Sequence, residues 1–244
     1  MGLFKSKNKA RAEKEPSKVE LVTFTEPKNV ISEQIRTVRT NIEFSAAGID
    51  DFKLMMLTSP EIGDGKSTVA ANLAVAWAQA GKRTLLVDTD LRRPTVHLSF
   101  YLDNQHGLST LLVRDEQPKE VIKGTFVPGL SVLTSGPVPP NPAELLASSK
   151  MGDLMHWMRE NFDVVLFDAP PVIAVSDAQV LMPRVDGVAL VVTMNKTLKS
   201  NLNRTVEILQ LSENTKILGA IERVKDKRSD DGYGYGYGYG YGDN

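Results

Sequence analysis

Short apolar runs alternate with longer amphipathic segments along most of the chain. The runs have the length and apolar content of buried strands, whereas the segments between them are rich in helix formers or repeat apolar residues at helical spacing. We expect strands at residues 53–58, 83–88, 130–133, 163–168, 187–193 and 216–221. We expect helices at residues 28–46, 69–80, 107–113, 118–123, 142–161, 176–182 and 198–211. This alternation predicts an α/β fold with a doubly wound, mostly parallel sheet.

The predicted helix at residues 28–46 carries two stripes that run side by side. The apolar stripe, at steps of four, three and four, consists of Ile31, Ile35, Val38 and Ile42. The charged stripe, at steps of three, consists of Glu33, Arg36 and Arg39. A charged stripe is most often a solvated helix flank. It could also be a self-complementary contact, in which the glutamate of one subunit meets an arginine of the next.

A glycine-rich loop joins the first strand to the next helix, with the sequence SPEIGDGKST at residues 59–68. Its two glycines permit a backbone that turns successive N–H groups onto phosphate oxygens, at the positive end of the following helix. In this pattern Lys66 adds a point charge, and the Ser67 hydroxyl is the expected magnesium ligand. The residues expected to hold the phosphates are Gly63, Asp64, Gly65, Lys66, Ser67 and Thr68.

The match to the general phosphate-loop pattern is specific in its second half. That pattern has a glycine six residues before the lysine, where this chain has Pro60. The alternative interpretation is a glycine-rich turn with a surface lysine.

Aspartates follow two of the predicted strands. Asp88 and Asp90 lie two positions apart in LLVDTDLR, so in extended chain their side chains point the same way. Asp168 ends the run VVLFD. Ligands of open α/β sheets bind outside the carboxyl ends of the strands, so we expect these aspartates at one magnesium–phosphate centre. The alternative for Asp88 and Asp90 is a structural role in a turn.

Residues 232–242 alternate glycine and tyrosine and hold five of the six tyrosines of the chain. These are Tyr233, Tyr235, Tyr237, Tyr239 and Tyr241. About twelve extended residues reach roughly 40 Å, enough to enter the site of a neighbouring subunit. The alternative is an adhesive low-complexity segment without chemistry.

Composition limits the classes of function. A formal net charge of −1 argues against nucleic acid as the main partner. The absence of cysteine excludes disulfides and thiolate metal sites and fits a reducing compartment. No apolar run approaches the roughly 18 residues of a membrane-spanning helix, and no signal peptide is visible, so we expect a cytoplasmic protein.

Residues 1–18 contain six lysines or arginines, two glutamates and almost no apolar side chains, a composition typical of disorder. Such a segment is either a solvated tail or a basic tail near an anionic membrane surface. We divide the chain into a basic, largely disordered segment at residues 1–27, one domain at residues 28–224 that begins with the helix at residues 28–46, and a flexible Gly/Tyr-rich tail at residues 225–244.

Together these motifs resemble the bacterial tyrosine kinases, specifically the cytoplasmic kinases that control capsule or exopolysaccharide synthesis in Gram-positive bacteria. Residues 59–68 resemble their Walker A motif, residues 85–92 their Walker A′ motif and residues 165–171 their Walker B motif. The tyrosine tail and the Glu33/Arg36/Arg39 stripe resemble their phosphoacceptor cluster and oligomerisation motif. The resemblance covers the chain from about residue 30 to the end. The family also lacks the early glycine of the general loop pattern, so Pro60 agrees with it. The resemblance implies a fold of the P-loop NTPase type.

The resemblance implies a protein-tyrosine kinase that uses ATP and Mg²⁺ and phosphorylates its own tyrosine tail in trans. Lys66 and the loop amides would hold the β- and γ-phosphates, and Ser67 would ligate magnesium directly. Asp90 and Asp168 would act through the water shell of the magnesium. Asp88 is the implied base that accepts the phenol proton.

The resemblance also implies partners. The helix at residues 28–46 would hold a ring-like homo-oligomer, for which an octamer is the family precedent. A separate transmembrane activator would recruit the cytoplasmic kinase to the inner face of the plasma membrane. Other protein tyrosine substrates are implied, and nucleic acid is not.

Two other hypotheses compete with the kinase. The first is a switch ATPase of the cell-division or partitioning type, which shares the fold. Such proteins have an extra lysine five residues before the invariant one, where this chain has Glu61, and they lack a tyrosine tail. The second is a nucleotide-dependent adaptor whose tail docks or is modified by another kinase.

Overall fold

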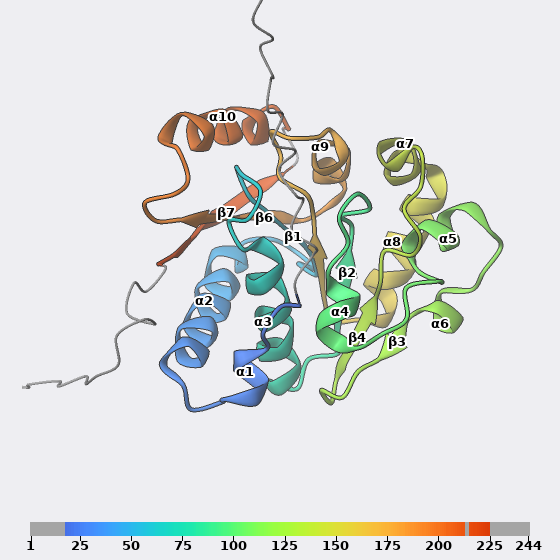
Figure 1. Ribbon diagram of the computed structural model, residues 1–244, viewed down its shortest axis with the longest axis horizontal. Coiled ribbons are helices and arrows are strands. Elements are labelled where there is room, and N and C mark those ends of the chain that lie inside the picture. Colours follow the sequence, from blue (N-terminus) through green and yellow to red (C-terminus); the bar gives the residue numbers. More distant parts are fainter. Residues whose placement is uncertain (1–17, 213–214, 225–244) are drawn as a thin grey trace, which may run out of the picture.

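A seven-stranded sheet forms the centre of the molecule in a computed structural model, which describes residues 18–212 and 215–224 (Figure 1). The strands are β1 (Leu54–Thr58), β2 (Thr84–Asp88), β3 (Lys123–Gly124), β4 (Leu130–Leu133), β5 (Val164–Asp168), β6 (Gly187–Thr193) and β7 (Lys216–Arg223). Their spatial order is β3-β4-β2-β5-β1-β6-β7, and among these strands β3 alone pairs antiparallel. The predicted mostly parallel α/β fold is confirmed.

Helices cover both faces of the sheet, and each face has its own hydrophobic core. Side chains alternate across a strand, so the fully buried Met55 and Met56 belong to different cores. The helices over the face of Met55 are α1 (Val22–Thr25), α2 (Val30–Ala46), α3 (Lys66–Gln79) and α4 (Val96–Phe100). Those over the face of Met56 are α5 (Leu108–Val113), α6 (Pro118–Val121), α7 (Pro142–Ala147), α8 (Ser149–Asn161), α9 (Asp177–Leu181) and α10 (Lys199–Gln210), with a 3₁₀ turn at Met182–Arg184. Burial on both faces explains why the strands appear as continuous apolar runs.

The helix predicted at residues 142–161 is two helices, so that prediction was wrong in one respect. Ser148 has extended backbone (φ −62°, ψ 158°) between α7 and α8, and its hydroxyl oxygen accepts a hydrogen bond from the Met151 amide. The serine thus caps α8 and interrupts the helical backbone. The methionines of α8 are buried packing residues, as expected from their spacing.

The packed body begins before the predicted boundary at residue 28. Leu21 and Thr23 are buried, and the Thr23 amide donates to Asn72 Oδ1 of α3 at 2.9 Å. Asn72 in turn donates to the Glu20 carbonyl oxygen at 2.9 Å. These contacts fix α1 on α3, so residues 18–27 belong to the domain and the predicted disorder does not apply to them.

The tyrosine tail and residues 1–17 lie outside the described residues. Within residues 18–212 and 215–224, no helix has the length and apolar character required to cross a bilayer.

Candidate active site

The loop between β1 and α3 has the backbone geometry of an anion-binding cradle. Gly63 and Gly65 have φ angles of 77° and 84°, in the left-handed region that side chains disfavour. Gly65 is the N-cap of α3, and Lys66 and Ser67 open the helix. The first amides of a helix have no partner within it, so Ser67 and Thr68 lie where an anion can bind their N–H groups.

The phosphate loop is held in shape by the segment that follows β6. Asp64 is fully buried, and its carboxylate accepts from the Glu61 amide at 3.0 Å and pairs with Lys196 Nζ at 2.8 Å. Lys196 also donates to the Ile62 carbonyl oxygen at 2.8 Å. The hydrogen bond from the Leu198 amide lowers the pKa of Glu61. The side chain of Asp64 therefore supports the loop, and the Asp64 amide donates to the Glu61 carbonyl oxygen at 3.4 Å.

Arg223, the last residue of β7, lies against the same loop. Its Nη1 donates to the Asp64 carbonyl oxygen at 3.0 Å, and Thr193 Oγ1 donates to that oxygen at the same distance. A β-carbon on Gly65 would lie only 1.6 Å from Arg223 Nη1, so Gly65 is also required for close packing. Among the described residues this is the one hydrogen bond that the guanidinium donates, so its other N–H groups remain for an anion in the loop.

Lys66 joins the phosphate loop to the carboxyl ends of two strands. Its Nζ lies 3.1 Å from Asp90 Oδ2, 3.3 Å from Asp168 Oδ1 and 3.3 Å from Ser67 Oγ. Burial alone would lower the pKa of Lys66, but the charges of Asp168, Asp90 and Asp88 outweigh it and raise the pKa. The lysine therefore stays charged beside the carboxylates, as a phosphate-binding cation must.

Asp88 is completely buried at the end of β2 and is held from three directions. Its Oδ2 accepts from the amides of Thr95 and Val96 at 3.1 Å each, and its Oδ1 accepts from the Asp90 amide at 3.2 Å. Burial first, and then the charge of Asp168, raise the pKa of Asp88 to about 8, against the opposing effect of Lys66. Such a carboxylate holds a proton far more firmly than an ordinary aspartate does.

The residues around Lys66 fit a magnesium ion held mainly through water and phosphate. Burial raises the pKa of Asp168, and its Oδ2 is buried without a hydrogen-bond partner among the described residues. A buried unpaired carboxylate oxygen requires a donor, and a metal-bound water supplies one. Among the described residues no three His, Cys, Asp or Glu side chains form a metal cage. Mg²⁺ commonly binds one or two carboxylates and substrate phosphates and keeps several waters.

The predicted site residues fall into separate groups in space. The structure brings together those of the phosphate loop with Asp88, Asp90 and Asp168, whereas the charged stripe lies on α2. There Glu33 and Arg36 form an exposed ion pair. Arg39 instead donates to the Ala76 carbonyl oxygen of α3 at 2.9 Å, so it also fastens α2 to the body.

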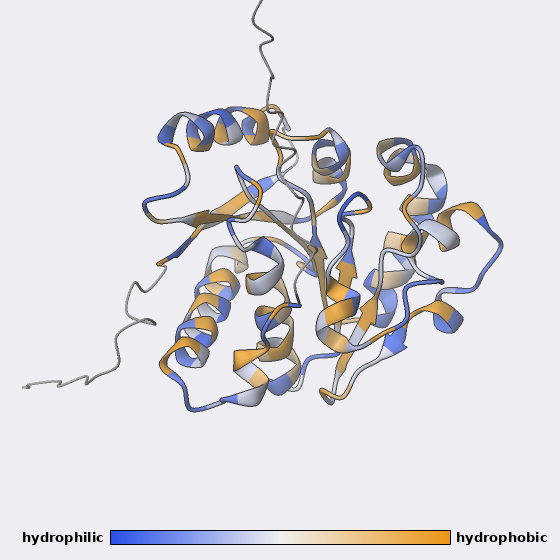
Figure 2. Ribbon diagram, in the orientation of Figure 1, coloured by the Kyte–Doolittle hydropathy of each residue, from blue (hydrophilic) through white to orange (hydrophobic). Residues whose placement is uncertain are grey.

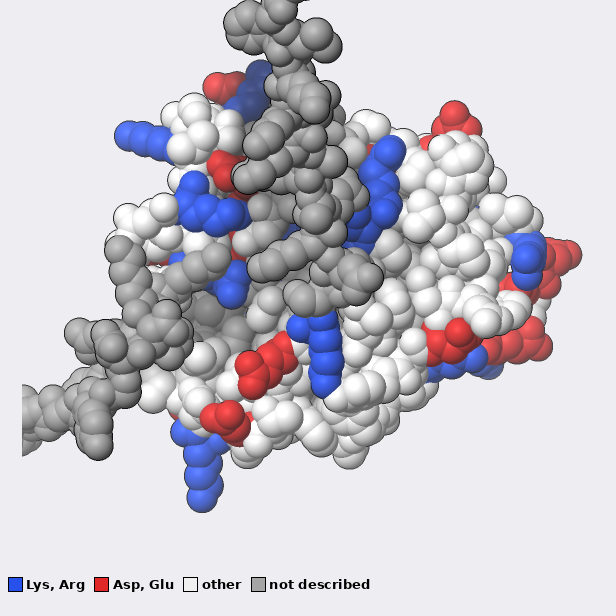
Figure 3. Space-filling model, in the orientation of Figure 1, with Lys and Arg blue, Asp and Glu red and all other residues white. Residues whose placement is uncertain are grey.

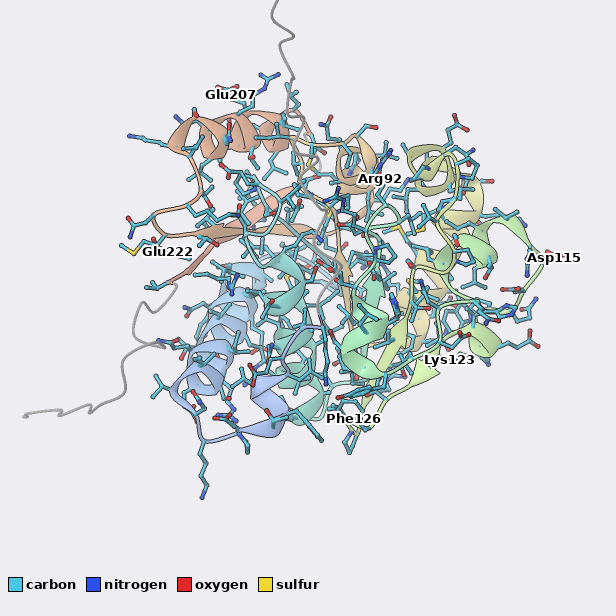
Figure 4. All side chains as sticks on the ribbon, in the orientation of Figure 1. Arg92, Asp115, Lys123, Phe126, Glu207 and Glu222 are labelled. Carbon is cyan, nitrogen blue, oxygen red and sulfur yellow. The ribbon has the colours of Figure 1, made fainter. Side chains whose placement is uncertain are left out.

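Three cationic residues near the site were missed by the sequence analysis. Lys196 and Arg223 contact the phosphate loop from the far end of the sequence, and no local motif marks them. Arg92 extends from the segment after β2 and pairs with the buried Asp177 of α9 at 2.7 Å (Figure 4). Arg92 lies within the LLVDTDLR motif, which was the available signal for it.

Comparisons with known proteins agree with this geometry. The chain matches the AAA domain family over residues 53–218. It is 47% identical over 216 residues to the tyrosine-protein kinase YwqD of Bacillus subtilis strain 168, a match that covers 87% of this chain and 90% of YwqD. It is 41% identical over 201 residues to the protein named "putative tyrosine-protein kinase CapB" of Staphylococcus aureus, and this match covers 82% and 87% of the two chains.

The fold matches that of a solved kinase domain. The kinase domain of the Escherichia coli tyrosine kinase ETK has a TM-score of 0.81 and 32% sequence identity with this chain. The match covers 94% of this chain and 89% of that domain. Since the relatives match most of the chain at these identities, the chain belongs to the bacterial tyrosine-protein kinases.

Proposed function

We propose that this kinase transfers the γ-phosphoryl group of ATP to tyrosines of the tail of a second copy. The observation that carries the proposal is the meeting of Lys66 with Asp88, Asp90 and Asp168 at one edge of the sheet, beside a loop with anion-binding geometry. Phosphoryl transfer needs positioned groups and neutralised charge more than covalent chemistry, and this arrangement supplies both.

The phosphate loop and Lys66 would hold the β- and γ-phosphates. Ser67 would ligate Mg²⁺ directly, and Asp90 and Asp168 would accept hydrogen bonds from its water shell. When bound, the cation neutralises charge on the transferred group. Removal of a single such contact typically slows an enzyme by about 10²–10³-fold.

Asp88 is proposed as the base that accepts the proton of the tyrosine hydroxyl. A phenol, with a pKa of about 10, gives up its proton far more readily than an aliphatic hydroxyl does. The amides of Thr95, Val96 and Asp90 fix the carboxylate in place. A carboxylate fixed in this way suits proton transfer from a phenol.

The five tail tyrosines are the proposed phosphoacceptors. They are Tyr233, Tyr235, Tyr237, Tyr239 and Tyr241. Each phosphate adds about −1.5 to −2 charges, so five would place roughly −8 to −10 on one tail. We expect that repulsion to open a ring of subunits that contact one another through the charged stripe of α2. Unchanged particle size in light scattering after full phosphorylation would remove this part of the proposal.

We propose the biological role of this kinase from the names of its relatives. CapB bears a capsule-type name, which supports a role in capsular or exopolysaccharide synthesis. We propose that a separate transmembrane activator recruits the kinase to the inner face of the plasma membrane, and that an octameric ring is one of its states. Other protein tyrosines are further substrates under this proposal.

The test is incubation of the purified full chain with labelled ATP and Mg²⁺, alone and with its activator. The kinase predicts phosphotyrosine confined to the five tail positions, absent in Lys66→Met and strongly reduced in Asp88→Asn. ATP hydrolysis without phosphotyrosine in the presence of the activator would instead indicate a switch ATPase. The comparisons do not favour that alternative, because YwqD and ETK, which match most of the chain, are tyrosine-protein kinases.

A further inference from the structure

A cavity of about 360 Å³ lies beside α8, over the face of the sheet that carries Met56, and none of the active-site residues lines it. Small-molecule sites commonly have volumes of about 300–1,000 Å³. The apolar part of the lining consists of two buried side chains, Leu54 at the start of β1 and Met155 of α8. Figure 2 shows apolar and polar residues alternating along α8. The cavity therefore offers both apolar and polar contacts.

Arg184 brings a positive charge to this cavity that no acidic side chain pairs with among the described residues. Its Nη1 donates to the Ser148 carbonyl oxygen at 2.9 Å and its Nη2 to the Ala147 carbonyl oxygen at 2.5 Å. A guanidinium has five N–H groups, so others remain for an anionic ligand. Glycine is a poor helix former, yet Gly152 stands within α8 beside this arginine. A β-carbon there would lie 3.8 Å from Arg184 Nη1, so the glycine leaves room next to the guanidinium.

Arg159 of α8 lines the same cavity with a second guanidinium that is held from behind. Its Nη2 pairs with Asp186, and its Nη1 donates to the Asp51 carbonyl oxygen at 2.7 Å. The other oxygen of Asp186 accepts from the amides of Lys53 and Leu54 at 2.9 and 2.8 Å. Within residues 18–212 and 215–224 the Nε of Arg159 forms no hydrogen bond. The arginine is thus fixed before a ligand arrives and keeps a donor for it.

The described residues that line this cavity include basic side chains but no acidic one. His156 lies there with the two arginines, and its Nε2 is 3.3 Å from Glu160, which lies outside the lining. Ser149 also lines the cavity and is the first residue of α8, so the positive end of the helix dipole adds to the potential. These groups favour an anion.

A second cavity, of about 220 Å³, also borders α8 and has a different charge balance. Its charged lining residues are the basic Arg114 and Lys150 and the acidic Asp115, Glu116 and Asp153. Among the described residues on the face drawn in Figure 3, blue and red side chains are likewise interspersed. Basic side chains without acidic ones therefore distinguish the first cavity from the second.

We propose that the cavity between Arg159 and Arg184 binds a phosphotyrosine side chain of the tail, residues 232–242. Guanidinium groups bind phosphate through charge-assisted hydrogen bonds, and arginines are the usual readers of phosphorylated residues. The aromatic ring would pack on Leu54 and Met155, a contact that inorganic phosphate cannot make. Each tail tyrosine has glycine on both sides, so no neighbouring side chain obstructs its entry. The proposal rests on the proposed phosphorylation of the tail for the origin of its ligand.

The cavity and the active site use different ends of the strands. Leu54 begins β1 and Arg184 lies just before β6, whereas Asp88 and Asp168 end β2 and β5. None of the lining residues belongs to the phosphate loop at residues 59–68. A phosphorylated tail held in the cavity would therefore leave the loop free to exchange ADP for ATP.

The experiment measures the fluorescence anisotropy of a synthetic peptide of residues 232–242 that carries phosphate on Tyr237. The peptide is added to the full chain with its five tail tyrosines changed to Phe, in saturating ADP and Mg²⁺, so that neither the chain's own tail nor an empty phosphate loop competes. We expect at least tenfold tighter binding than for the unphosphorylated peptide. Arg184→Gln should weaken that binding about tenfold, and so should Gly152→Leu, which fills the cavity without a change of charge.

The matched control is Arg114→Gln, which removes an arginine of the second cavity and should leave the affinity unchanged. Unchanged circular dichroism and ATP affinity show that each variant is folded. The proposal is overturned if phosphate on the peptide does not strengthen binding, if Arg114→Gln weakens it as much as Arg184→Gln does, or if inorganic phosphate displaces the peptide as well as phenyl phosphate does. The peptide is phosphorylated before the assay, so these results are independent of whether the kinase labels its own tail.

Discussion

Lys66 and Asp168 form a buried contact of 3.3 Å that satisfies only one of the two carboxylate oxygens. The second oxygen of Asp168 has no hydrogen-bond partner among the described residues. Lys66 also faces Asp88 and Asp90, so three acidic side chains surround one lysine. An unpaired carboxylate oxygen and three acidic side chains around one lysine fit a cationic ligand.

Asp168→Asn should reduce kinase activity strongly while it changes the stability of the fold little. The substitution removes one of three carboxylates around a single lysine while Asp90 keeps its contact with Lys66, so we expect the free energy of unfolding to fall by no more than about 1 kcal/mol, or to rise. Phosphotyrosine formation should fall by about 100-fold or more, because the acceptor for a magnesium-bound water is lost. Urea unfolding and labelled-ATP assays measure the two effects. A loss of several kcal/mol would show that Asp168 is mainly structural.

Arg223→Ala should weaken nucleotide binding more than it slows the reaction. A hydrogen bond to a charged group contributes about 1.5–3 kcal/mol, so we expect the dissociation constant of ATP to rise roughly tenfold, with partial recovery in Arg223→Lys. Fluorescent-nucleotide titration measures this.

Thr193→Val is the matched control for Arg223, because Thr193 donates to the same carbonyl oxygen of Asp64 but carries no charge. It should change the affinity for ATP much less than Arg223→Ala does. Equal losses in the two variants would mean that Arg223 merely holds the loop and does not contact the anion.

The arginines of α2 should differ in what they stabilise. Arg36 pairs with Glu33 and donates to the Pro27 carbonyl oxygen at the exposed surface, so Arg36→Ala should cost the monomer less than about 1 kcal/mol. Arg39→Ala should cost about 1–2 kcal/mol because it removes the bond to Ala76 of α3. If the stripe is the subunit interface, light scattering should show smaller assemblies for both variants. Full-size assemblies of Arg36→Ala would rule out that role for Arg36.

Acid should remove the stability that one ion pair, formed between the residues just before β2 and β5, contributes to the fold. Arg83 donates to Asp163 at 2.7 Å through its side chain and at 2.8 Å through its amide, and these bonds lower the pKa of Asp163 to about 2. A lowered pKa stabilises the fold above the unfolded value of about 3.9, and the stabilisation disappears as the pH falls through about 2. Because solvent screens this largely exposed pair, we expect its contribution to the free energy of unfolding at pH 6 to be small.

The comparison of the unaltered chain with Asp163→Asn in urea unfolding from pH 6 to pH 2 measures that contribution. The difference in unfolding free energy should shrink steadily towards the acid end. Glu207→Gln, which breaks the exposed Arg204–Glu207 pair, should change stability far less throughout. A difference that stays constant with pH would show that the ion pair is not its source.

The elements that the sequence predicted well are those in which a local residue pattern directly reflects burial or backbone conformation. Strands β1 and β5 were predictable because both faces are covered, and the phosphate loop was predictable because Gly63 and Gly65 need left-handed backbone. Short elements such as β3 and α4 left no periodic signal. The break at Ser148 was hidden because serine also occurs within helices.

Long-range contacts within the site could not be predicted from spacing. Lys196 and Arg223 reach the phosphate loop only because β6 lies beside β1 in the sheet and β7 beside β6. The residue pattern of a single segment does not predict this strand order. Likewise, the hydrogen bonds that fix Asp88 come from amides at the start of α4, an element that was not predicted. Asp88 and Asp168 each end a parallel strand and Asp90 follows two residues after Asp88, so their common edge of the sheet follows from parallel topology alone.

The most direct test of phosphoryl transfer between subunits mixes two variants of the full chain, neither of which can label itself. One chain carries Lys66→Met with its tail intact, and the other has an intact site with all five tail tyrosines changed to Phe. With ATP, Mg²⁺ and activator, we expect that neither chain alone gains phosphotyrosine, whereas the mixture gains it only on the tail of the Lys66→Met chain. Absence of phosphotyrosine from the mixture, under conditions in which the unaltered chain labels its own tail, would contradict transfer between subunits.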